Sequence, residues 1–222
     1  MSSLSPLLPR LTGTIVGTLL NHRPALAALG DAASAPPSKA PPQAPVLYVK
    51  PHNTQVRDGA LVHLPPGESV QVAACLGLVI GATACRVSPA AARSCIAGAV
   101  AVADLSLPHA SFYRPSLRFK VRDGFCPMGD VVAMPAAGPD ALGMRVFIDG
   151  QLAHETDTGD RIRDASQLVA DISGFMTPHP GDVVLTGASH GAPLARAGQA
   201  VRIEIDGLPA LGFRLAAEEV VA

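Results

Sequence analysis

The stretch of this sequence that is richest in possible chemistry runs from residue 112 to residue 127, FYRPSLRFKVRDGFCP. Arg114, Arg118, Lys120 and Arg122 recur at even spacing with one gap. On a strand, this spacing would place all four cations on one face. Such a face would attract an anion, and arginine suits a carboxylate because its fork donates two hydrogen bonds. A solvated edge strand, whose charges oppose aggregation, explains the pattern equally well.

Two smaller features could also take part in chemistry. His22 follows an apolar stretch, and an imidazole can carry a proton near neutral pH, although an isolated histidine is more often a surface or capping residue. The turn at residues 187–191, GASHG, offers backbone N–H groups that could hold an anion. The sequence has no GxGxxG, Walker A or HExxH motif, so nucleotide binding and zincin chemistry have no support.

The composition indicates a globular chain with ample core material. Its 222 residues suit one domain, and 17 basic against 18 acidic residues argue against a nucleic-acid binder. The four cysteines, Cys75, Cys85, Cys95 and Cys126, form no CxxC pair, so we expect free thiols in a reducing compartment. The sequence shows neither a signal peptide at its start nor a run of 18 apolar residues, so we expect a cytoplasmic protein.

Strands must position most of the candidate residues. Apolar and alternating stretches predict strands at residues 13–20, 46–49, 69–84, 144–149, 183–186, 201–205 and 211–215. Helices are expected at residues 24–30, at the start of 89–104 and within 160–176. Residues 31–45, rich in Ala and Pro, predict an exposed lid or linker loop. The fold class is therefore α+β, mainly β.

Six segments, taken together, resemble the fumarylacetoacetate hydrolase family. They are YVKPHNT (48–54), LVIGATA (78–84), ADLSL (103–107), SFYRP (111–115), KVRDGFCPMG (120–129) and PGDVVLTG (180–187). The similarity runs from about residue 13 to the end, which divides the chain into an N-terminal extension, 1–12, and one family domain, 13–222. It implies mixed sheets that form a partly open barrel or roll with few helices.

The details of three segments, LNHR (20–23), SFYRP and RDGFCPMG, are most similar to one branch of that family. This branch acts in 4-hydroxyphenylacetate (homoprotocatechuate) catabolism, and the resemblance is to its N-terminal half or separate N-terminal-type subunit. It implies decarboxylation of 5-oxopent-3-ene-1,2,5-tricarboxylate and isomerisation of 2-hydroxyhepta-2,4-diene-1,7-dioate, both through a dienolate. Two alternatives stay open: a non-catalytic scaffold subunit that stabilises a metal-bearing partner, and a self-sufficient hydrolase or isomerase of the family.

The resemblance also assigns roles to individual residues. Lys120 matches the active-site lysine, Asp104 matches an acidic residue of the site, and His22 matches a lid histidine that assists proton transfer. Thr158 and Gly187 match positions near the substrate. Arg114 is our own candidate for binding a substrate carboxylate.

The sequence departs from the family pattern at the metal site. The family's Glu-x-Glu pair falls on Ala73 and Cys75, and only the third acidic position, Asp104, is kept. Alanine offers no ligand, and a thiol is a poor ligand for Mg²⁺. We therefore expect no tightly bound metal on this chain and a Mg²⁺ or Mn²⁺ ion on a related partner subunit. A homo- or hetero-oligomer that binds neither nucleic acid nor membrane is expected.

Overall fold

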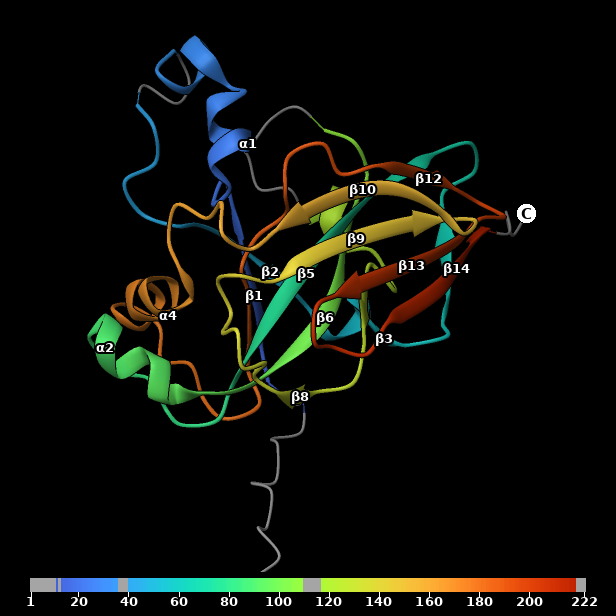
Figure 1. The fold of residues 1–222 in the computed structure, drawn as a ribbon. Coiled ribbons are helices and arrows are strands. Elements are labelled where there is room, and N and C mark those ends of the chain that lie inside the picture. The colour runs from blue at the N-terminus through green and yellow to red at the C-terminus, as the bar shows by residue number, and fades with distance from the viewer. Residues whose placement is uncertain (1–10, 12, 36–39, 110–116, 219–222) are drawn as a thin grey trace, which may run out of the picture.

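The computed structural model describes residues 11, 13–35, 40–109 and 117–218, which form two sheets with a few short helices (Figure 1). The larger sheet has the strand order β2 (Val46–Lys50), β1 (Ile15–Leu19), β11 (Val183–Leu185), β5 (Ser69–Ile80), β6 (Ile96–Ser106), β7 (Cys126–Met128) and β3 (Gln55–Arg57). It also includes β12 (Leu194–Arg196), paired with β5, and β8 (Val132–Ala133), paired with β6. The smaller sheet has the order β10 (Gln151–Asp157), β9 (Gly143–Ile148), β13 (Ala200–Ile205), β14 (Leu211–Ala217) and β4 (Leu61–Leu64).

The α-helices are all short. They are α1 (Arg23–Ala27), α2 (Pro89–Ala92), α3 (Leu117–Lys120) and α4 (Ala165–Ser173), with 3₁₀ turns η1 (Gly30–Ala33), η2 (His52–Thr54) and η3 (Arg93–Cys95). The longest, α4, begins after Asp164, whose side chain accepts a hydrogen bond from the Gln167 N–H at 2.7 Å. Within the described residues, no helix is long and apolar enough to span a membrane.

The main core lies between the two sheets. Alternate residues of β5, such as Leu76 and Leu78, pack in one cluster with Met144 and Ile203 of the smaller sheet. The intervening residues of β5, such as Val79, join a second cluster on the opposite face. Because β5 is buried on both faces, its sequence is almost continuously apolar, as fully buried strands usually are.

The fold agrees with the predicted class and with a curled, half-barrel arrangement of mixed sheets. All four cysteines lie in the described part of the chain and are free thiols. The strand proposed through Arg114–Arg122 is wrong over its described half, because Arg118 and Lys120 belong to the helical turn α3. The other half of that stretch, with Arg114, lies outside the described residues.

Candidate active site

The face of the sheet that carries the site is set by the pairing of β5 with β6. Asp104 of β6 lies directly opposite Ala73 of β5 in the antiparallel register. Cys75 follows two residues along β5, so its side chain points to the same face as that of Ala73. The three positions expected for metal ligands therefore share one face, although only one of them carries a carboxylate.

Asp104 is fully engaged by three neighbours. Its Oδ2 atom accepts hydrogen bonds from the Tyr48 hydroxyl at 2.5 Å and from Lys120 Nζ at 2.7 Å. Its Oδ1 atom forms an ion pair with Lys50 Nζ at 3.0 Å. Burial alone would raise the pKa of Asp104, but the charges on Lys120 and Lys50 outweigh it and hold that pKa well below its usual range.

Lys50 is a fully buried cation that connects three parts of the backbone. Its Nζ donates to the carbonyl oxygens of Leu105 at 2.9 Å, Lys120 at 2.7 Å and Phe125 at 2.7 Å. These bonds use all three of its hydrogens, so its approach to Asp104 is an ion pair without a hydrogen bond of its own. Burial lowers the pKa of Lys50, and the charge on Asp104 opposes that shift.

Sequence reasoning missed Lys50 and Tyr48, although both lie in a segment that carried the family resemblance. They are alternate residues of β2 and therefore point to the same side of the strand. The available signal was a lysine in an apolar strand immediately before Pro51. The Lys120 ammonium also lies over the Tyr48 ring, 4.6 Å from its centroid, so one compact network contains Asp104, both lysines and the tyrosine.

His22 is buried just beyond the end of β1, beside α1. Its Nδ1 atom accepts a hydrogen bond from the backbone N–H of His190 at 2.9 Å, so the neutral ring carries its proton on Nε2. Burial lowers the pKa of His22, and the positive charge of Arg161 lowers it further. His22 is therefore a neutral hydrogen-bond donor at neutral pH.

Gly187 and Thr158, the two positions expected near the substrate, have different surroundings. Gly187 has φ +104°, and a Cβ there would lie 3.0 Å from the Thr18 carbonyl oxygen, so the turn requires glycine. Thr158 is buried, and its hydroxyl oxygen accepts a hydrogen bond from the Leu142 N–H at 2.9 Å. Thr158 thus holds the backbone at this point, and ligand contact by either residue stays a prediction.

The Cys75 thiol lies between the Asp104 network and the turn at Gly187. Burial raises its pKa to about 11, and the charge on Asp104 acts in the same direction. Arg161, the Gly187 N–H and the Thr186 hydroxyl lower it without restoring the usual value. Cys75 is therefore a protonated thiol at neutral pH and is not a thiolate ligand.

Arg161 is a buried cation that sequence reasoning did not single out. Its side chain is near enough to act on the pKa values of both Cys75 and His22, and its backbone pairs with that of His22. In the sequence it belongs to DTGDRIRD (157–164), whose mixed charges are typical of a solvated loop. Nothing in that pattern distinguishes the buried Arg161 from its neighbours.

The residues present do not fit the divalent metal that the resemblance implies. Over the described ranges, no group of three His, Cys, Asp or Glu side chains could hold a metal ion. Ala73 has no donor atom, Cys75 keeps its proton, and both oxygens of Asp104 already face cations or a hydroxyl. A Mg²⁺ ion prefers several oxygen ligands, which this chain does not offer here.

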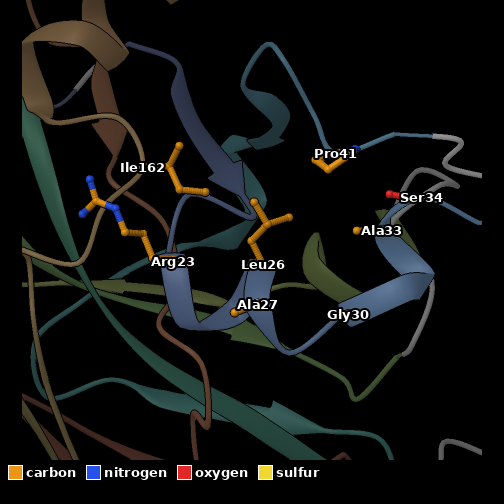
Figure 2. A pocket seen from close by; sticks show the side chains of 8 residues that line it. All are labelled: Arg23, Leu26, Ala27, Gly30, Ala33, Ser34, Pro41 and Ile162. Atoms are coloured by element: carbon orange, nitrogen blue, oxygen red, sulfur yellow. The ribbon is translucent and has the colours of Figure 1, made fainter.

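An open hollow of about 340 Å³ lies along α1 and η1 (Figure 2). The side chains of Leu26 and Ile162 line it on one side, and Ala33, Ser34 and Pro41 line it on the other. Arg23 and Ile162, the sequence neighbours of His22 and Arg161, also line it. None of the residues of α1 is buried, so this helix is lightly packed beside the site. The lid role of residues 31–45 stays a prediction.

Comparison with known proteins places these residues in context. Residues 14–216 match the family described as fumarylacetoacetate (FAA) hydrolase C-terminal. The 4-hydroxyphenylacetate degradation bifunctional isomerase/decarboxylase of Salmonella dublin is 41% identical over 212 residues, which are 96% of this chain and 49% of that protein. The chain thus spans about half the length of the isomerase/decarboxylases that it matches.

Solved structures are similar over nearly the whole chain. The 5-carboxymethyl-2-hydroxymuconate delta-isomerase from Mycobacterium smegmatis has a TM-score of 0.80 at 26% identity, covering 95% of this chain and 81% of that one. The fumarylpyruvate hydrolase from Pseudomonas aeruginosa, solved with Mn²⁺ and pyruvate, has a TM-score of 0.78 at 19% identity, covering 98% and 99%. The second similarity shows the fold alone.

Proposed function

Because the chain belongs to the fumarylacetoacetate hydrolase family, we propose that it is one subunit of an isomerase/decarboxylase of homoprotocatechuate catabolism. Its substrates would be 5-oxopent-3-ene-1,2,5-tricarboxylate, which loses CO₂, and 2-hydroxyhepta-2,4-diene-1,7-dioate, which is isomerised. The observation that carries the proposal is the buried ion pair between Lys120 and Asp104, at 2.7 Å, on the sheet face that the family pattern assigns to the site. The carboxylate of such a pair fixes the position of the lysine side chain in a buried site, where its electrostatic effect on a substrate is strong.

The isomerisation requires one proton to leave an oxygen and one to reach a carbon. The 2-hydroxyl group loses its proton, the double bonds shift along the chain, and C5 gains a proton to give 2-oxohept-3-ene-1,7-dioate. The intermediate is a dienolate, whose negative charge an adjacent cation stabilises. Decarboxylation gives the same kind of anion, because the electron pair of the broken C–C bond enters the conjugated system.

Lys120 is the proposed acid, and His22 is the proposed stabiliser of the oxygen. The proton of the 2-hydroxyl passes first to a water molecule, the Lys120 ammonium then delivers a proton to C5 of the dienolate, and the neutral amine recovers a proton from the water. Asp104 and Tyr48 orient Lys120. The neutral His22 ring donates its Nε2 proton in a hydrogen bond to the dienolate oxygen without giving it up. This role fits a histidine whose pKa is lowered by burial.

The metal expected in the family would be held by a related partner subunit. This chain covers 49% of the Salmonella dublin relative, so that protein contains a second segment of similar length. The family resemblance implies that such a second unit carries the metal-binding acids. A Mg²⁺ or Mn²⁺ ion bound there would supply a Lewis acid for 2-oxo acids.

The purified chain tests the proposal directly. Decay of the dienol absorbance of 2-hydroxyhepta-2,4-diene-1,7-dioate is followed with the chain alone, with Mg²⁺, and with a metal-bearing subunit of the family. Turnover is expected only with the partner, and Lys120→Ala in the reconstituted pair should lower the rate by about 100-fold or more. Arg202→Ala, on β13 where Arg202 lies over the Phe147 ring, is the control and should keep the rate.

A second candidate, the scaffold subunit, is favoured by one observation. The Asp104 carboxylate is held by Lys50, Lys120 and Tyr48, so the network could serve stability alone. A reconstituted pair with an unchanged rate after Lys120→Ala would establish the scaffold role and reject the catalytic one. Turnover by the chain without any partner would instead identify a self-sufficient enzyme.

A further inference from the structure

The guanidinium group of Arg161 is buried, and no hydrogen-bond partner for it lies in the described part of the chain. Its residue is 4% exposed, and none of its Nε, Nη1 and Nη2 atoms has a hydrogen-bond partner among the residues that the structure describes. Asp157 and Asp160 act on it only at longer range. A guanidinium carries five N–H donors, and leaving them all unsatisfied in the interior is strongly unfavourable. An arginine in this state indicates a binding site for a group that the chain itself does not supply.

The buried charges around Arg161 are also unbalanced. The charged side chains that are buried in the described part of the chain are Lys50, Lys120, Arg161 and Asp104. Asp104 faces the two lysines, so it cannot neutralise Arg161 as well. Three cations against one carboxylate leave an excess of two positive charges in the interior. Such an interior attracts an anion and repels a divalent cation.

Thr186 supplies a second buried donor in the same place. It is 3% exposed, and its hydroxyl acts on the Cys75 thiol, whose sulfur is only a weak acceptor. Thr186 lies beside Cys75, because its N–H donates to the carbonyl oxygen of the next residue, Leu76, at 3.0 Å. Asn21 joins Thr186 to the segment of Arg161, because its Nδ2 donates to the Thr186 carbonyl oxygen at 3.0 Å and its own carbonyl oxygen accepts from the Ile162 N–H at 2.9 Å. Cys75 occupies one of the two positions where the sequence pattern expects a metal-binding glutamate.

We propose that Arg161 and Thr186 form a carboxylate-binding subsite, in which the guanidinium fork and the hydroxyl receive the carboxylate of a 2-oxo or 2-hydroxy acid where a metal ion was expected. A carboxylate matches the planar fork of arginine with two parallel hydrogen bonds. The identity of the acid rests on the proposed function, whereas the anion site rests on the unsatisfied donors and the charge excess alone.

Entry to this subsite would require α1 to move. The backbones of His22 and Arg161 pair with each other, and α1 follows His22 immediately. Because α1 buries no residue and borders an open hollow (Figure 2), displacing it costs little packing. The carboxylate would then reach Arg161 from the side of α1.

Thermal unfolding of the full chain with EDTA present tests the subsite, with oxalate as the probe and sulfate at equal ionic strength as the comparison. Oxalate should raise the unfolding temperature of the native chain more than sulfate does. Arg161→Met should weaken oxalate binding by about 100-fold or more, and Arg161→Lys, which keeps the charge but loses the fork, by about 10-fold. Arg202→Met, the same change on the exposed face of β13, should keep oxalate binding.

The stability of the variants separates a binding role from a structural one. Removing an unpaired buried charge should leave the unfolding temperature of Arg161→Met equal to or above that of the native chain. A clear drop in that temperature, equal stabilisation by sulfate, or undiminished oxalate binding by Arg161→Met would each overturn the proposal. Oxalate binding by the chain without turnover by the reconstituted pair would reject the proposed function alone, and turnover by the pair that Arg161→Met leaves unaffected would reject the subsite alone.

Discussion

At the scale of single residues, Asp104 links the stability of the chain to its chemistry. Its carboxylate holds Lys120 in place and partly neutralises Lys50, and both lysines are buried. Removing one partner of a buried pair is costly because the remaining charges stay in the interior without compensation. The same contacts that would orient Lys120 for catalysis therefore stabilise the fold.

Acid should unfold the chain through Asp104. An aspartate in the unfolded chain has a pKa of about 3.9, and the pKa of Asp104 in the folded chain is lower. As the pH falls, the unfolded chain therefore binds this proton before the folded chain does. The stability from Asp104 is therefore complete above about pH 4 and is lost as the pH falls below that value. Urea unfolding between about pH 7 and pH 3 should show this loss, whereas Asp104→Asn should start about 3 kcal/mol less stable and change less with pH. If the stability of the native chain and that of Asp104→Asn changed with pH in parallel, this assignment would be wrong. Asp31→Asn on the exposed η1 turn is the control and should follow the native profile.

The sequence indicated part of this network. Asp104, Lys120 and His22 followed from the resemblance, and the structure brings Asp104 and Lys120 into contact. Lys50 and Arg161 escaped notice because a sequence does not state which of its cations are buried. The burial of Lys50 depends on distant segments that the fold brings to it, since its carbonyl partners Leu105 and Phe125 lie 55 and 75 residues away.

At the scale of elements, β1 and β2 place Tyr48 against Asp104. Gly17 of β1 lies opposite Tyr48 of β2 in the antiparallel register, and the Tyr48 ring lies over Gly17. A Cβ at position 17 would overlap the atoms of that ring. The absence of a side chain at Gly17 therefore lets the tyrosine hydroxyl reach the carboxylate.

Gly17→Ala should displace Tyr48. We expect a loss of about 1–3 kcal/mol in the free energy of unfolding, because the added methyl group overpacks the site. The pKa of Tyr48, raised far above its usual value mainly by burial, should fall when the ring moves toward solvent. Ultraviolet absorbance during an alkaline titration measures that change, since the chain has two tyrosines and no tryptophan.

Gly212→Ala on β14 is the matched control for this substitution. A Cβ there meets its nearest atom, Asp58 Oδ1, at 3.8 Å, which is an ordinary contact. If the two variants lost equal stability and left the Tyr48 titration unchanged, the proposed role of Gly17 would be wrong.

Hydrophobic pattern predicted the long strands and the three-residue strand β11, and it missed the other short strands. The apolar runs that became β1, β2, β5, β9 and β13 are long enough for their pattern to be recognised. The strands β3, β4, β7, β8 and β12 have two to four residues each, too few for a period to show. Even spacing of cations at Arg118 and Lys120 suggested a strand, but a helical turn forms there with Lys120 buried. A two-residue period in four residues is compatible with both structures.

At the scale of the whole molecule, two sheets enclose a core and one positively charged site. The main core takes residues from both sheets, so neither sheet is expected to be stable without the other. The interior charge lies on one face of the larger sheet, around Asp104 and Cys75. This distribution determines how the chain should respond to metal ions.

Divalent metal should leave the isolated chain almost unchanged. A site whose Kd for Mg²⁺ or Mn²⁺ is about a thousand-fold below the concentration of the ion would add about 4 kcal/mol to the free energy of unfolding. Because the donor set does not fit these ions, we expect a shift of less than about 1 °C in the unfolding temperature with either ion or with EDTA. A shift of several degrees that EDTA reverses would contradict this expectation, and NaCl at equal ionic strength is the control.

The distribution of the cysteines has a practical consequence for handling the protein. Cys85 is exposed, whereas Cys75, Cys95 and Cys126 are buried, and burial raises the pKa of Cys126 to about 12. A maleimide reagent should therefore attach once to the native chain and at all four sulfurs after denaturation. The mass of the labelled product then distinguishes folded molecules, with one label, from denatured molecules, with four. A dye attached at Cys85 marks the native protein at one defined position.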